Sequence, residues 1–141
     1  MSTLLFTFLV AFGVRLAWML LVQNPLSVIY SDMGTYVERA EELMWHLSTP
    51  DPRVLAIYPW GTHTLMALEF TVLGRHAELP LAVTHAFIGA IPAPCMVVVT
   101  SRIVRSDAVA AVVGFLVAFW YPQVAFAAFF LSEPWYSAAI A

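Results

Sequence analysis

Three stretches of the chain, 4–22, 79–101 and 108–131, are apolar at nearly every position and lack the polar side that a helix of a soluble protein shows. Each is long enough to cross roughly 30 Å of hydrocarbon at about 1.5 Å per helical residue. A fourth helix is expected from Glu133, after Ser132 and before a proline. The pattern therefore predicts an all-α, polytopic membrane protein forming a single membrane domain over residues 1–141.

The first apolar stretch is expected to remain as a membrane span, since neither a basic leader nor a small-residue cleavage site accompanies it. Arg15 lies inside it and costs roughly 2.5 to 3.5 kcal/mol at the middle of a bilayer on insertion scales. Two arrangements relieve this cost. Arg15 either faces protein or a polar cavity, or extends its long side chain to the membrane interface.

Proline interrupts the other two apolar stretches. Pro92 and Pro94 lie inside 79–101 and predict a kink or a locally unwound turn there. In 108–131 the interruption is Tyr121-Pro122-Gln123.

Two helices of a different pattern are predicted between the first two spans. In 32–48 the apolar residues recur at three- and four-residue steps: Met33, Val37, Ala40, Met44 and Leu47. Charged residues take the other side, as in a helix that lies along a bilayer with its apolar side down. Residues 58–73 follow a Tyr-Pro turn and end before Gly74, and they are short for a full crossing.

Arg102 and Arg105 determine the predicted topology. Basic loops favour the cytoplasmic side, so the span 79–101 runs inward and 108–131 runs back out. The first span then ends outside, and 58–73 is re-entrant or interfacial. Glu133 is external.

Composition agrees with a membrane protein and argues against a nucleic-acid partner. Hydrophobic residues make up 62% of the chain and charged residues 11%, with a mean hydropathy of +0.84, whereas soluble domains have about half and about a quarter. The formal charge is −3, and most acids lie between the first two spans, which argues against a nucleic-acid partner. The single cysteine, Cys95, lies in an apolar run and forms no intrachain disulfide.

Motifs of common enzyme classes are absent from the sequence. The four histidines lack a Cys or His partner at zinc spacing, and there is no nucleophile elbow, Walker loop or dinucleotide fingerprint. What remains is a set of ionisable groups at one membrane face: Asp32, His63, Glu69, Glu133 and, from below, Arg15. A carboxylate at such a boundary can accept a proton from a hydroxyl or amine.

The order of these features resembles the N-terminal part of membrane-embedded GT-C glycosyltransferases, the class of protein O-mannosyltransferases and aminoarabinose transferases. The likeness comprises an external S-D-x-x-x-Y helix, a Tyr-Pro turn opening an apolar helix, a span closed by a basic loop, and a span ending in S-E-P. It implies an inverting transferase of a bacterial plasma membrane, with its active face outside, that takes a sugar from a polyprenyl-phosphate donor.

The resemblance also implies roles for particular residues. Asp32 would be the catalytic base and Glu133 a second catalytic carboxylate, while weaker substrate-binding roles fall to Arg15, Tyr36, Tyr58 and His63. A lone Asp32 stands where the family has an acidic pair, which does not support a bound divalent metal. No cofactor is otherwise implied.

The same residues could instead have purely structural roles. Asp32 can cap the helix that follows it, Glu133 can favour a helix N-terminus, and His63 can be a hydrogen-bonded structural histidine.

Family members have several hundred residues and further basic residues for the donor phosphate. We therefore expect this chain to be an incomplete N-terminal fragment or one piece of a split enzyme, inactive alone. Two other functions fit the sequence. A transporter or channel subunit would line a conduction path with Arg15, His85 and the proline-broken span. A non-catalytic membrane assembly partner fits the short length.

Overall fold

The computed structural model describes residues 2–25, 27, 29, 31–45, 60–75, 77–129 and 132–141. In this part of the chain every regular element is an α-helix, which confirms the all-helical prediction there. The helices are α1 (Thr3–Leu21), α2 (Asp32–Trp45), α4 (Trp60–Leu73), α5 (Glu78–Ala90), α6 (Pro92–Val104), α7 (Asp107–Ala118), α8 (Tyr121–Phe126) and α9 (Ser132–Ile140). The predictions for 46–59, Tyr58 among them, lie outside the described residues.

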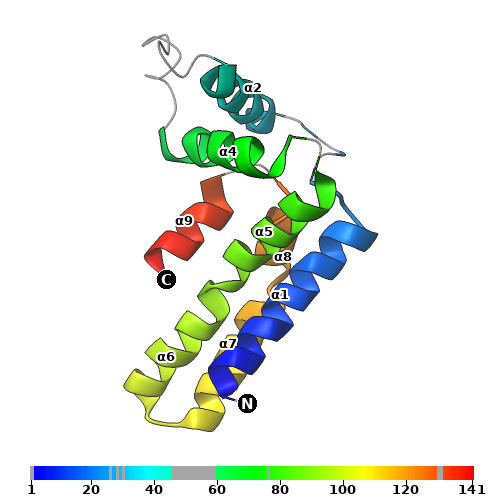
Figure 1. Cartoon of the computed structure of the whole chain (residues 1–141). Coiled ribbons are helices and arrows are strands. Elements are labelled where there is room, and N and C mark those ends of the chain that lie inside the picture. Colours follow the sequence, from blue (N-terminus) through cyan, green and yellow to red (C-terminus); the bar gives the residue numbers. More distant parts are fainter. Residues whose placement is uncertain are drawn as a thin grey trace.

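The helices form a long bundle with a layer across one end. Helices α1, α5, α6 and α7 run along the bundle, and α6 follows directly on α5 (Figure 1). Helices α2 and α4 lie across the end at which α1 finishes and α5 begins, and we call this pair the crossing layer. The N-terminus and the turn between α6 and α7 lie at the opposite end (Figure 1).

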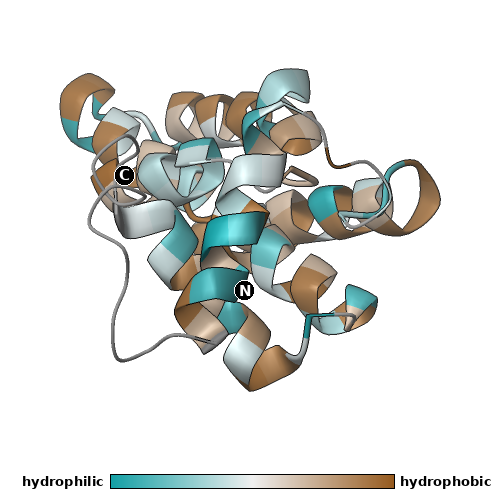
Figure 2. Cartoon of the chain, turned by 90° about the horizontal axis from the view of Figure 1, so that it is seen from above, coloured by the Kyte–Doolittle hydropathy of each residue, from teal (hydrophilic) through white to brown (hydrophobic). Residues whose placement is uncertain are grey.

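Two of the described helices are long and apolar enough to cross a membrane, Thr3–Leu21 with 19 residues and the kinked Glu78–Val104 with 27. Large apolar side chains are exposed on both, including Leu5, Leu9 and Phe87. Hydrophobic residues, drawn in brown, recur along most of the helices in Figure 2. Helix α7 is also apolar but has only 12 residues.

Small residues fill the centre of the bundle. Ala11 of α1, Ala90 of α5, Ala93 of α6 and Ala118 of α7 form one fully buried cluster. Small side chains let helix backbones approach closely, and interfaces between membrane helices are enriched in them.

Proline determines where two of the helices break. Pro92 lies in the first turn of α6, and the helix is interrupted at Ile91, so the predicted kink is present. Pro122 lies in the first turn of α8, and α7 already ends at Ala118. The predicted interruption is therefore present among the described residues, where it separates α7 from α8. The physical reason is that Pro122 has no N–H to donate to the carbonyl of Ala118, four residues earlier.

The crossing layer has its own apolar core. Met33, Val37 and Ala40 of α2 are buried against Met66 and Phe70 of α4. The predicted apolar side of α2 is present, but it packs on α4 and not on lipid. The reason is that α4, which was predicted as a separate interfacial helix, has apolar side chains facing α2.

Candidate functional site

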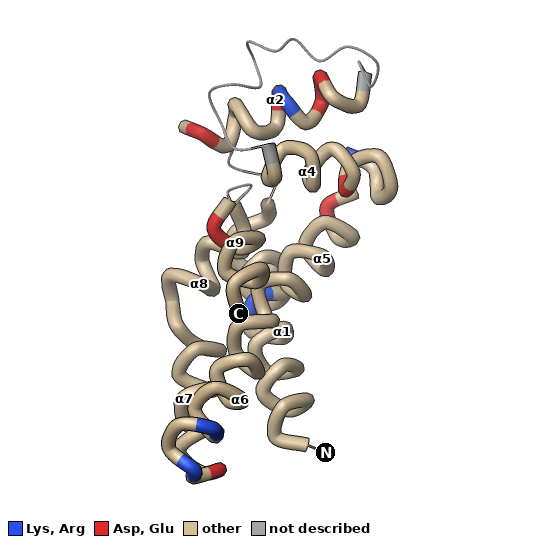
Figure 3. The backbone as a smooth tube through the Cα atoms, turned by 90° about the vertical axis from the view of Figure 1, so that its left-hand side faces the viewer, with Lys and Arg blue, Asp and Glu red and all other residues tan. Residues whose placement is uncertain are grey.

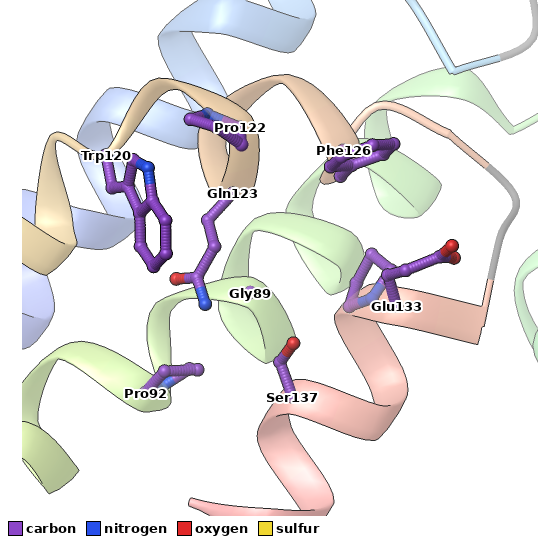
Figure 4. A pocket seen from close by; sticks show the side chains of 9 residues that line it. Gly89, Pro92, Trp120, Pro122, Gln123, Phe126, Glu133 and Ser137 are labelled. Atoms are coloured by element: carbon purple, nitrogen blue, oxygen red, sulfur yellow. The ribbon is translucent and has the colours of Figure 1, made fainter.

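A pocket of about 140 Å³ lies where the break between α5 and α6 meets α8 and α9. It is lined by Gly89, Pro92, Trp120, Pro122, Gln123, Phe126, Glu133, Pro134 and Ser137. Most of this wall is apolar, while the side chains of Gln123 and Ser137 point into the pocket (Figure 4). An apolar wall with a few convergent polar groups is usual for small-molecule sites.

The pocket exists because several helix ends meet at one place. Helix α5 ends beside it, while α8 and α9 begin there. Pro92, Pro122 and Pro134 each lie in the first turn of a helix, where the fixed backbone angle of proline is tolerated and its missing N–H is not needed. Three of the helices around the cavity therefore have a proline in their first turn.

Arg15 lies in the protein interior beside this pocket. Its side chain is fully buried, which agrees with the protein-facing alternative and excludes an extended side chain at the interface. The Nη1 group donates to the carbonyl oxygens of Ala11 (3.0 Å) and Ala118 (3.1 Å), and Nη2 donates to Oε1 of Gln123 (3.4 Å). The carbonyl of Ala118 is the one that Pro122 cannot bond, so the helix break supplies an acceptor for the guanidinium.

The two predicted catalytic carboxylates occupy different parts of the structure. Glu133 lies in the first turn of α9, is exposed and lines the pocket. Asp32 is the first residue of α2 and is also exposed, but it is not among the residues that line this pocket. Helix α4 packs against both α2 and α9 and lies between them (Figure 1). A cavity shared by Asp32 and Glu133 therefore stays a prediction.

Two of the predicted substrate-binding residues belong to the crossing layer. Tyr36 is buried in the apolar core between α2 and α4. His63, in the first turns of α4, is fully buried. Burial lowers the pKa of His63, and the positive charge of Arg39 on α2 lowers it further. Neither residue lines the pocket beside Arg15. The third, Tyr58, lies outside the described residues.

A buried acid–base pair joins the crossing layer to the bundle. Nε2 of His85, on α5, lies 3.1 Å from Oε2 of Glu69, on α4, and both side chains are almost fully buried. Nδ1 of His85 lies 3.3 Å from the carbonyl oxygen of Ala127. A carbonyl oxygen can only accept, so Nδ1 is placed to donate to Ala127, while Nε2 faces the Glu69 carboxyl group. The ring of Trp135 packs edge-on against His85.

The sequence offered only partial signals for these groups. Glu69 was predicted among the ionisable groups at one membrane face and His85 as a possible lining of a conduction path, but nothing in their spacing paired them. Gln123 belongs to the recognised Tyr-Pro-Gln interruption, and a polar side chain at a proline break in an apolar run is the signal that could have marked it. Ser137 follows only from the fold.

Acidic residues are concentrated at one end of the bundle. Most of them lie on the crossing layer and at the nearby ends of α5 and α9, together with Arg39 and Arg75, whereas Arg102, Arg105 and Asp107 lie around the turn between α6 and α7 (Figure 3). Between these ends Arg15 is buried. Among the described residues no group of three or more His, Cys, Asp or Glu side chains is placed to hold a metal ion.

No protein-family model, curated protein or solved structure matches the chain.

Proposed function

We propose that the chain takes part in transferring a sugar from a polyprenyl-phosphate donor to an acceptor at the external face of a membrane, as an inverting transferase of the GT-C type. The observation that carries the proposal is the crossing layer. Two helices lie across the bundle end that is opposite the turn with Arg102 and Arg105, and the first of them, α2, carries four acidic residues (Figures 1 and 3). A GT-C enzyme needs such juxtamembrane helices between its first and second spans.

The direction of the bundle in the membrane follows from charge. Arg102 and Arg105 lie at one end, and basic loops favour the cytoplasmic side. The crossing layer is then external, together with Glu133. In this multi-pass arrangement α1 leads outward, α5 and α6 lead inward, and α7 with α8 leads outward again. The exposed apolar side chains of these helices contact lipid.

Asp32 is the proposed general base. Its side chain is exposed at the start of α2, and no hydrogen bond or ion pair to it occurs among the described residues. In the proposed step the acceptor hydroxyl or amine gives its proton to the Asp32 carboxylate and its lone pair attacks the anomeric carbon. The bond from that carbon to the phosphate oxygen breaks from the opposite side, and the lipid phosphate leaves with the electron pair. The anomeric centre is thereby inverted.

Glu133 has a separate proposed role. The anomeric carbon gains positive charge as the phosphate leaves, and a fixed carboxylate near it lowers the energy of that state. Glu133 is exposed at the rim of the pocket that lies between the α5/α6 break, α8 and α9.

The test replaces Asp32 by Asn in the native gene and measures transfer in membranes of the cells that carry it. Labelled polyprenyl-phosphate sugars are supplied as a panel, because the sugar is not specified. Removal of a general base lowers turnover by about 10²- to 10⁴-fold. The matched control is Glu38→Gln, an exposed acid on the same helix, which should leave turnover within about twofold. Wild-type turnover in Asp32→Asn would remove Asp32 from the mechanism.

The transporter alternative has less support. It requires Arg15 and His85 on one water-filled route and α4 as a true span. Both side chains are instead enclosed by protein partners, and α4 lies across the end of the bundle.

A further inference from the structure

Two polar atoms in the pocket between the α5/α6 break, α8 and α9 have no hydrogen-bond partner in the described part of the chain. They are Nε2 of Gln123 and Oγ of Ser137, and both side chains are partly buried and point into the pocket (Figure 4). A polar group in apolar surroundings costs free energy until another group bonds to it. A ligand that bonds to both atoms would remove this cost.

Arg15 determines which part of the Gln123 amide faces the pocket. Its Nη2 donates to Oε1 of Gln123 over 3.4 Å, and a guanidinium can only donate, so Nε2 is left for other partners. The positive charge beside Oε1 also polarises the amide and makes its N–H groups stronger donors. The hydroxyl of Ser137 can rotate to donate into the same part of the pocket (Figure 4). Two donors are therefore available to one ligand atom.

The inner end of the pocket offers no ionic partner to a charged ligand. Arg15 does not line the pocket, because Gly89 and Gln123 lie in between. A Cβ atom at Gly89 would be 3.1 Å from Cδ and 3.2 Å from Nε of Arg15. Glu133 does line the pocket, but it is exposed and its carboxylate points away from Gln123 and Ser137 (Figure 4). A charged group would therefore lose its hydration there without forming an ion pair, which is costly. An uncharged ligand is favoured.

The rest of the pocket suits an apolar body. Trp120 and Phe126 are 56% and 40% exposed and lie at its outer part, and the remaining wall is mostly proline. Aromatic rings gain free energy when an apolar ligand covers them. The pocket thus combines two hydrogen-bond donors with an apolar surface.

We propose that this pocket binds an uncharged carbonyl compound, whose oxygen accepts from Nε2 of Gln123 and Oγ of Ser137 and whose apolar body covers Trp120 and Phe126. A carbonyl oxygen has two lone pairs and can accept both bonds. An alcohol oxygen that accepted both would bring a hydroxyl hydrogen with no acceptor of its own, so a carbonyl group fits better. The site requires neither Asp32 nor sugar transfer, so it goes beyond the proposed function.

The experiment measures ligand binding to the purified full chain in maltoside micelles by saturation-transfer nuclear magnetic resonance. Four small probes are titrated: acetophenone, 1-phenylethanol, ethylbenzene and benzoate. The first three share one carbon skeleton, so they differ in the oxygen group alone. Acetophenone should bind about tenfold more tightly than ethylbenzene, because two hydrogen bonds are gained, and more tightly than the alcohol or benzoate. No lipid-linked sugar is present, so the outcome is independent of transfer activity.

Variants then locate the site. Ser137→Ala removes one donor and should weaken acetophenone about fivefold while leaving ethylbenzene unchanged. Ser137→Trp fills the pocket and should abolish binding of both. Its matched control is Ala139→Trp, an exposed position on the same helix that does not line the pocket, which should bind as wild type.

A competition distinguishes two sources of the carbonyl group. Displacement of acetophenone by dioctanoylglycerol, but not by its diether analogue, supports the ester of a membrane lipid. Displacement by neither supports a free small molecule.

Three results would overturn the proposal. Equal affinities for acetophenone and ethylbenzene would remove the carbonyl group, and tighter binding of benzoate would remove the uncharged ligand. Unchanged binding in Ser137→Trp would show that the probes bind elsewhere. Should Ser137→Trp fail to fold, Ser137→Ala decides by the ratio of the two affinities, since a purely structural effect would weaken acetophenone and ethylbenzene alike.

Discussion

Replacing Gly114 by Ala should loosen the packing of α7 against its neighbours. A Cβ atom at Gly114 would lie 2.3 Å from Cγ2 of Val97 on α6 and 3.0 Å from Cγ2 of Thr7 on α1. Both distances are below ordinary van der Waals contact, and the two neighbouring side chains are themselves buried. Val and Thr are branched at Cβ and have few alternative rotamers in a helix. The helices must therefore move apart.

The size of the effect follows from two opposing contributions. Inserting a methyl group into a packed core destabilises by about 1 to 3 kcal/mol, and the 2.3 Å approach to Val97 places this case at the upper end. Alanine stabilises a helix over glycine by about 0.5 to 1 kcal/mol. We expect Gly114→Ala to destabilise the chain by about 2 kcal/mol.

The assay is the thermal unfolding of purified chain in detergent micelles, followed by far-ultraviolet circular dichroism. Gly13→Ala is the matched control, since Gly13 also lies within a helix and a Cβ atom there would meet nothing within 4 Å. Gly13→Ala should unfold at or above the wild-type temperature and Gly114→Ala well below it. Equal midpoints for the two variants would refute the close approach of α6 and α7.

Two further predictions concern the crossing layer and the ends of the bundle. The pKa of His63 is lowered by burial and then by Arg39, so the unfolded state binds more protons below about pH 6.5, and stability should fall there. His63→Gln should reduce the difference between unfolding midpoints at pH 5 and pH 8, and an unchanged difference would contradict this assignment. With Cys95 replaced by Ala, a membrane-impermeant maleimide added to intact cells should label Arg75→Cys but not Arg102→Cys, and the reverse would invert the proposed orientation.

Local patterns were enough to find most helices. The apolar runs 4–22 and 79–101 coincide closely with α1 and with α5 and α6, because hydrophobicity over a helix length is a property of neighbouring residues. The kink at Pro92 followed from the missing N–H of proline. The interruption at Tyr121-Pro122-Gln123 has the same cause, and there one helix ends and another begins.

The candidate site was only partly accessible from sequence. Glu133 and Arg15 were recognised because charged residues in apolar surroundings are conspicuous. Gly89 and Ser137 carry no such signal, because a glycine or serine in a helix does not by itself indicate a pocket. The apolar side of α2 was predicted, but its contact with α4 was not. An amphipathic pattern is the same whether the apolar side of the helix contacts lipid or another helix.

By itself, the sequence determined an all-helical chain over the described residues, apolar stretches long enough to cross a membrane, and the positions where proline breaks them. Helix formation and proline chemistry act within a few residues, so they can be read locally. Only the tertiary structure decided that Arg15 bonds Ala118 and Gln123, more than a hundred residues away in the chain. It likewise decided that Glu69 meets His85. Such contacts depend on how whole helices pack, and no short-range pattern encodes that packing.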